Sequence, residues 1–124
     1  MHPAALVGLG GAVGSIARWA ISEMIPLEQD GHMPWATITV NLLGAFLLGA
    51  LMTLAALSEI ESGTVLLVGT GLLGGFTTMS TFGFETMRLV QSGSTTIAAA
   101  YVMLNMLAPV LAWVGWEAAH AIAA

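Results

Sequence analysis

Four long apolar segments fill almost the whole of this chain and restrict the folds open to it. They run over about residues 3–25, 34–57, 64–90 and 95–119. Each exceeds the roughly 20 helical residues needed to cross a hydrocarbon core of about 30 Å. Because every backbone N–H and C=O inside a bilayer needs a partner within the protein, such segments are expected to be helical. We therefore predict an all-α membrane protein with four transmembrane helices.

Charged residues are too scarce for a soluble domain. They make up 7% of the 124 residues, against roughly 25% in typical soluble domains. The breaks between the apolar segments are short and leave no room for a further domain. Residues 1–124 are therefore predicted to form a single multi-pass domain in the cell membrane (inner or plasma membrane), with membrane lipid as one partner.

Basic residues are the scarcest charged type. Seven acidic residues stand against two basic ones, Arg18 and Arg88, which gives a net charge of −5. So few cations cannot neutralise a phosphate backbone, which excludes nucleic acid as a partner. Lys and Arg in short loops set membrane orientation, and the first two loops contain neither. Two outcomes stay open: insertion both ways with assembly as an antiparallel pair, or one orientation set weakly by Arg88.

The third apolar segment carries the most unusual sequence of the chain. It reads Gly74-Gly75-Phe76-Thr77-Thr78-Met79-Ser80-Thr81-Phe82. A glycine pair followed by two threonines predicts that the helix breaks at Gly74-Gly75, in the middle of the membrane. Broken helices at that depth are tolerated where the freed backbone is buried in protein or lines a wet cavity, often at an ion site. The interruption thus favours transport over a structural role.

Four helices enclose too little space for a pathway within one subunit, so an oligomer is expected. Small residues recur at four-residue spacing and allow helices to approach closely. These pairs are Gly10 and Gly14, Ala45 and Gly49, and Gly71 and Gly75. We expect packing within the subunit to explain most of them, and contacts between subunits the remainder.

Two polar side chains in the first two segments are candidates for function. Arg18 is the basic residue of the first segment, and a charge at membrane depth is costly. It either attracts anions at a vestibule or extends toward the interface and fixes the depth of the helix. Asn41 lies inside the second segment and offers two donor hydrogens and an acceptor. It either contacts an ion or joins two helices by hydrogen bonds.

The third segment adds two groups of side chains at helical spacing. Thr78, Thr81 and Glu85 share one face, and Met79 and Phe82 share another. Hydroxyl groups and the electropositive edge of a phenylalanine ring both suit an anion. The chain has no arrangement of paired carboxylates, or of a nucleophile with a base, that suggests catalysis, so we expect no enzyme.

These residues resemble the small bacterial fluoride channels of the Fluc, or CrcB, family over nearly the whole chain. The first segment contributes Gly10-Gly11-x-x-Gly14-Ser15-x-x-Arg18-Trp19, and the second Thr37-x-x-Val40-Asn41-x-x-Gly44-Ala45-Phe46. The third contributes the most specific motif, Gly71-x-x-Gly74-Gly75-Phe76-Thr77-Thr78-x-Ser80-Thr81-Phe82-x-x-Glu85.

The resemblance implies a dual-topology antiparallel homodimer with two fluoride pores at the subunit interface. It implies a structural sodium ion on the dimer axis, held by the backbone carbonyls of Gly74 and Thr77 from each subunit. Arg18 corresponds to an arginine near the vestibule. The fluoride path is implied to include residues of the second, third and fourth segments: Asn41, Met79, Ser80, Thr81, Phe82, Glu85, Tyr101 and Asn105.

Two residues depart from the family pattern. Met79 stands where the family usually has a first phenylalanine, and Asn105 stands where hydroxyl residues are more usual. Methionine is polarizable and flexible, and its methyl group next to sulfur carries partial positive charge, so it suits an anion path. Asn105 supplies a further donor.

Neutral donors suit fluoride, because the ion is small and holds its water tightly. A pore must replace that water shell, whereas a fixed Lys or Arg in a narrow path would bind the ion too tightly to release it. We therefore predict a passive fluoride channel that lowers cytoplasmic fluoride. The alternatives are a dual-topology small multidrug or cation exporter, which needs a carboxylate within the first segment, and a structural membrane subunit, which does not need the interruption.

Overall fold

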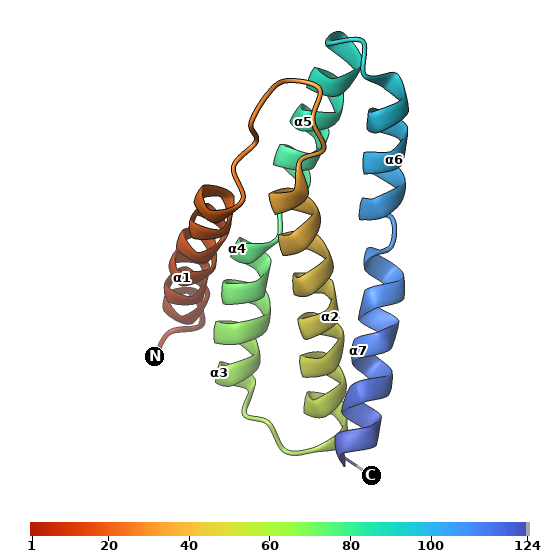
Figure 1. Ribbon diagram of the computed structural model, residues 1–124. Coiled ribbons are helices and arrows are strands. Elements are labelled where there is room, and N and C mark those ends of the chain that lie inside the picture. Colours follow the sequence, from red (N-terminus) through yellow and green to blue (C-terminus); the bar gives the residue numbers. More distant parts are fainter. Residues whose placement is uncertain (124) are drawn as a thin grey trace.

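The computed structural model describes residues 1–123, which form helices joined by short turns (Figure 1). Four helical spans are long and apolar enough to cross a membrane. The first two are α1 (Pro3–Met24) and α2 (Trp35–Leu57). The third is assembled from α3 (Ser62–Thr64), the π-helix η1 (Val65–Leu73), α4 (Gly74–Phe76) and α5 (Met79–Gln91). The fourth consists of α6 (Thr95–Asn105) and α7 (Ala108–Ala123).

Both the third and the fourth spans are interrupted near their middles. In Figure 1, α4 and α5 occupy opposite halves of the molecule, as do α7 and α6. The third span was expected to break, but the interruption of the fourth at Met106-Leu107 was not predicted. Its physical cause is Pro109, which has no N–H to donate to the carbonyl of Asn105 and whose ring clashes with that carbonyl.

Close backbone approach joins α1 to the third span. A methyl group added at Gly10 would overlap the carbonyl oxygen of Leu67, and one added at Gly14 would overlap that of Leu72. From the other side, a methyl group at Gly75 would come within 2.7 Å of the Gly11 oxygen. These glycines therefore serve packing within the subunit, where only a hydrogen atom fits between the helices.

Close backbone approach at glycines also joins α2 to α7, which lie side by side in Figure 1. An added methyl group at Gly49 would overlap the carbonyl of Ala112, and one at Gly115 would overlap that of Phe46. In the other half of the molecule, α2, α5 and α6 bury an apolar cluster around Tyr101, which is 0% exposed. α2 therefore packs against α7 in one half of the molecule and against α5 and α6 in the other. These contacts fix the positions of the interruptions relative to α2.

The connection between α1 and α2 is tied to the end of α5. Arg88 donates through Nη2 to the carboxylate of Asp30 at 2.9 Å, and both side chains are largely exposed. An exposed pair of this kind contributes about 0–1 kcal/mol. The contact holds the connection near α5 without contributing much to the stability of the fold.

Candidate functional site

The break in the third span lies at Thr77-Thr78, not at Gly74-Gly75 as the sequence suggested. Gly74 and Gly75 are helical in α4, whereas Thr77 and Thr78 are extended, with ψ of 156° and 120°. The glycines stay in the helix because Gly75 is needed for contact with Gly11. The predicted position was therefore wrong by about three residues, and the interruption itself is present.

Thr78 ends the break and begins α5. Its hydroxyl accepts from the backbone N–H of Thr81 at 3.2 Å and donates to the Thr81 hydroxyl at 3.0 Å. A threonine at this position satisfies one of the free N–H groups at the start of a helix. The threonine pair thus gives an extended backbone first and a helix cap immediately afterwards.

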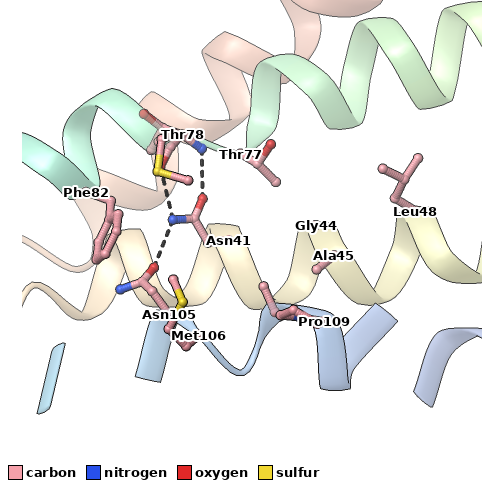
Figure 2. A pocket seen from close by; sticks show the side chains of 12 residues that line it. Asn41, Gly44, Ala45, Leu48, Thr77, Thr78, Phe82, Asn105, Met106 and Pro109 are labelled. Carbon is pink, nitrogen blue, oxygen red and sulfur yellow. Dashed lines mark hydrogen bonds between the residues drawn. The ribbon is translucent and has the colours of Figure 1, made fainter. Parts of the chain in front are cut away.

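Asn41 reaches the break from α2 and binds both sides of the Thr78 backbone (Figure 2). Its Oδ1 accepts from the Thr78 N–H at 2.8 Å, and its Nδ2 donates to the Thr78 carbonyl at 3.0 Å. The same Nδ2 donates to Oδ1 of Asn105 at 2.9 Å, at the end of α6. One amide therefore gives the Thr78 N–H the partner that the break removes, adds a donor to the Thr78 carbonyl, and also connects the two interrupted spans.

Arg18 binds the other side of the break. Its Nε donates to the carbonyl of Gly75 at 3.0 Å, an oxygen that would accept from residue 79 in an unbroken helix. The side chain is partly buried and borders a cavity of about 220 Å³ that is also lined by Thr37, Thr78 and Thr81. Arg18 is thus both a partner of the break and a wall of a polar cavity.

A larger open cavity of about 410 Å³ lies where both interruptions face α2; we call it the groove. Its polar side chains are Asn41, Thr77, Thr78 and Asn105. The apolar part of the wall consists of Gly44, Ala45, Leu48, Met79, Phe82, Met106, Ala108 and Pro109. Uncharged donors and apolar groups line the groove in the part of the chain that is described.

The residues predicted to line the fluoride path lie in several different parts of the structure. Asn41, Met79, Phe82 and Asn105 line the groove. Thr81 and Glu85 border a separate cavity of about 270 Å³ near Arg88. Met79 is 73% exposed beside the break.

The remaining predicted residues lie on surfaces or in the core. Ser80 and Gly74 are on the exposed face of the third span. Tyr101 is buried and packs against Phe82, with ring centroids 5.3 Å apart. Thr77 lines the groove, and its hydroxyl donates to the carbonyl of Leu73.

Glu85 is held by two hydroxyl groups. Thr37 donates to its Oε1 at 2.6 Å and Tyr101 donates to the same oxygen at 2.8 Å. Hydrogen bonds to an ionised carboxylate are stronger than those between neutral groups. Sequence reasoning did not assign Thr37 to this role, and its position one turn before Asn41 on the same helix was the available signal.

Sequence reasoning also missed the part of the groove that the interruption of the fourth span and the start of α7 supply. Met106, Ala108 and Pro109 belong to the wall because the fourth span is interrupted there. A proline four residues after Asn105 was the signal, since a proline within a helical pattern cannot donate to the carbonyl four residues earlier and ends or kinks the helix before it.

Comparison with known proteins gives consistent matches over most of the chain. The family described as "CrcB-like protein, Camphor Resistance (CrcB)" matches residues 5–116. The protein named fluoride-specific ion channel FluC of Methylobacillus flagellatus is 42% identical over 120 residues, which cover 94% of each chain. FluC 2 of Moorella thermoacetica is 39% identical over 94% of this chain and 95% of its own. FluC of Sorangium cellulosum is 39% identical over 87% and 86%, respectively.

Proposed function

This chain belongs to the CrcB-like family, and we propose that it is a fluoride-specific ion channel of the cell membrane, as the names of its relatives imply. It is a multi-pass protein with four apolar helical spans. The observation that carries the proposal is the groove, where uncharged donors gather at two helix interruptions. Such donors can replace the water shell of fluoride while still releasing the ion.

The transport is proposed to be passive and to protect the cell. Hydrogen fluoride is a weak acid that crosses lipid as the neutral molecule and ionises in the less acidic interior, so fluoride accumulates there. A selective path outward dissipates that accumulation without an energy source. The groove has no carboxylate or basic side chain in its described wall, which fits conduction better than exchange of protons for a cation.

The alternative of a small multidrug or cation exporter has little support. That mechanism requires a carboxylate inside the first span, where α1 carries Arg18 instead. Glu23 is exposed at the last turn of α1, outside the groove.

Fluoride release from liposomes tests the proposed function. Purified protein in liposomes loaded with potassium fluoride is expected to release fluoride, measured with a fluoride electrode, once valinomycin lets potassium follow. Parallel liposomes loaded with chloride are expected to retain it. Absence of fluoride release, or equal release of chloride, would contradict the proposal.

We propose in addition that two copies form an antiparallel dimer through the exposed face of the third span. Thr70, Gly74, Ser80 and Gly83 are exposed there, and the hydroxyl groups among them are poorly suited to lipid. The small residues would allow a second copy to approach closely. The near absence of Lys and Arg from the loops supports insertion in both orientations.

A sodium ion at the dimer axis is part of the same proposal. The carbonyls of Gly74 and Thr77 fit it, because oxygen ligands suit a hard cation and Gly74 lies on the exposed face. Arg18 occupies the intervening Gly75 carbonyl, which directs that oxygen away from an ion. When bound, the ion would neutralise carbonyl dipoles that the break leaves without partners.

Exchange of the cation tests the sodium proposal. We expect a lower thermal midpoint in N-methylglucamine chloride than in sodium chloride at equal ionic strength, because a ligand that binds only the folded dimer stabilises it, by about 2.7 kcal/mol at 100 times its dissociation constant. The variant Gly74→Ala is expected to lose this difference. Its methyl group meets nothing closer than the Gly69 oxygen at 3.8 Å in the single chain, so the loss would come from the interface. Equal midpoints for the unmodified protein in both salts would refute the sodium site.

A further inference from the structure

The connection between α1 and α2 covers a cavity at one end of the molecule. We call residues 26–33 the strap; it runs from the end of α1 past α5 to the start of α2 (Figure 1). The cavity of about 270 Å³ near Arg88, which we call the chamber, lies between the strap and α5. The strap contributes Leu27 and Asp30 to its wall, and α5 contributes Thr81 and Glu85. Because residues 26–30 are exposed, the strap separates the chamber from water.

The chamber adjoins the smaller polar cavity beside the break. Thr81 borders both the chamber and the cavity of about 220 Å³ that Arg18 and Thr78 line. Thr37, in the wall of that smaller cavity, donates to Glu85 in the wall of the chamber at 2.6 Å. A single water needs only about 10–15 Å³, so both cavities have room for water and a small ion. Together they extend from the strap to the break in the third span.

The strap is held firmly at one end and weakly at its tip. At the α2 end, Met33 packs against the apolar cluster and Pro34 is buried. Among residues 1–123, the hydrogen bonds that join the strap to a helix other than its neighbours α1 and α2 run from Arg88 to Asp30. Nη2 of Arg88 lies 2.9 Å from each carboxylate oxygen. This ion pair therefore decides whether the tip of the strap stays on α5.

The ion pair is placed so that it can break and form again. The Arg88 guanidinium lies 5.8 Å from the ring centroid of Phe84, one turn earlier on α5, a cation–π contact that keeps it at the rim of the chamber. The side chains of Arg88 and Asp30 are 48% and 64% exposed. Exposed pairs favour the paired state by at most about fivefold, and salt weakens them. The pair therefore acts as a reversible latch.

We propose that the strap is a lid on the chamber, closed while Asp30 is paired with Arg88 and open when the pair breaks. The inference rests on the proposed fluoride conduction, in which the open strap lets ions pass between the chamber and water. When the latch opens, Arg88 stays at the rim with its charge unpaired, and a positive charge at an opening raises the local concentration of anions. The motion that opens the chamber therefore also makes its rim attractive to an anion.

A disulfide can hold the strap closed. A Cβ atom at Gly31 would lie 3.9 Å from Cβ of Ser94, within the range of about 3.5–4.5 Å found in disulfides. The chain has no cysteine of its own. In liposomes, the oxidised double variant Gly31→Cys/Ser94→Cys is expected to release fluoride at least several-fold more slowly than the same protein after reduction with dithiothreitol, because a locked lid blocks passage.

Two controls belong to the disulfide test. Gly31 has φ of 91°, where a side chain is strained, so Gly31→Cys alone shows the cost of the substitution without the cross-link. Ser94→Cys alone shows the effect of a thiol in the turn before α6. Mass spectrometry gives the fraction of cross-linked protein. A complete cross-link that leaves fluoride release unchanged would overturn the proposal.

The latch has a separate readout that does not require fluoride. Thr81→Cys places a small thiol in the chamber wall, and its reaction rate with a charged methanethiosulfonate in detergent reports access from water. Adding Asp30→Asn is expected to raise this rate by up to about fivefold. The increase is expected to shrink in about 1 M sodium chloride, where salt already screens the pair.

Glu28→Gln is the matched control for the latch. Glu28 is the other carboxylate of the strap, and the structure pairs it with no base among residues 1–123, so its loss changes the charge equally without releasing the tip. Equal thiol reaction rates in the Asp30→Asn and Glu28→Gln backgrounds would overturn the role of the latch. Failure of the unmodified protein to release fluoride would instead refute the proposed function, while the thiol reaction would still test the strap.

Discussion

Replacing Gly14 by alanine is expected to destabilise the protein by about 3 kcal/mol or more, the upper part of the range for overpacked interiors. The added methyl group would overlap the carbonyl oxygen of Leu72 and lie 2.9 Å from the backbone nitrogen of Phe76. Backbone atoms cannot rotate out of the way as a side chain does, so α1 must move from the third span. The measurement is the thermal midpoint and the monodisperse fraction in detergent.

Gly8→Ala is the matched control for this prediction. Gly8 lies on the same helix, and an added methyl group there would have nothing within 4 Å. Alanine also favours helix over glycine by about 1 kcal/mol, so this variant should be as stable as the unmodified protein or slightly more so. Similar midpoints for Gly8→Ala and Gly14→Ala would show that the close approach of α1 does not limit stability.

The position of the break illustrates how far local sequence reasoning reaches. Glycine pairs and threonine pairs both interrupt helices, so the sequence placed the break within a few residues. The prediction chose the glycine pair and was wrong, because the role of Gly75 depends on Gly11 approaching from another helix. A contact between segments that are distant in sequence cannot be predicted from a local pattern. The preference of Thr77-Thr78 for an extended backbone, in contrast, is a local property.

The groove shows the same limit at the level of side chains. Asn41 was recognised as a polar residue inside an apolar segment and Asn105 as a departure from the family pattern, but their hydrogen bond depends on the register of α6 against α2. Asn105 is the last residue of α6, directly before the interruption of the fourth span at Met106-Leu107. Proline at position 109 was present in the sequence, and giving it more weight would have predicted a second interruption and a wider site.

Arg18→Met is the substitution expected to affect fluoride release most strongly among changes outside the groove. It removes the donor that binds the Gly75 carbonyl at 3.0 Å and leaves that oxygen without a partner beside the break. The expected cost is about 2 kcal/mol or more, with displacement of α4 and of Thr77 in the groove wall. We expect fluoride release to fall at least several-fold, because Thr77 would no longer keep its place in the groove wall.

Arg18→Gln separates the attraction of anions, which the sequence suggested for this residue, from the contact with the Gly75 carbonyl that the structure shows. The glutamine nitrogen is the same number of bonds from the backbone as Nε of arginine, so it can donate to the Gly75 carbonyl without a charge. If the carbonyl contact matters, Arg18→Gln should keep most of the fluoride release that Arg18→Met loses. If attraction of anions matters, both variants should lose release to a similar extent. Arg88→Met is the control, because Arg88 is largely exposed and paired with Asp30 away from the break, and a comparable loss there would attribute the effect to overall charge.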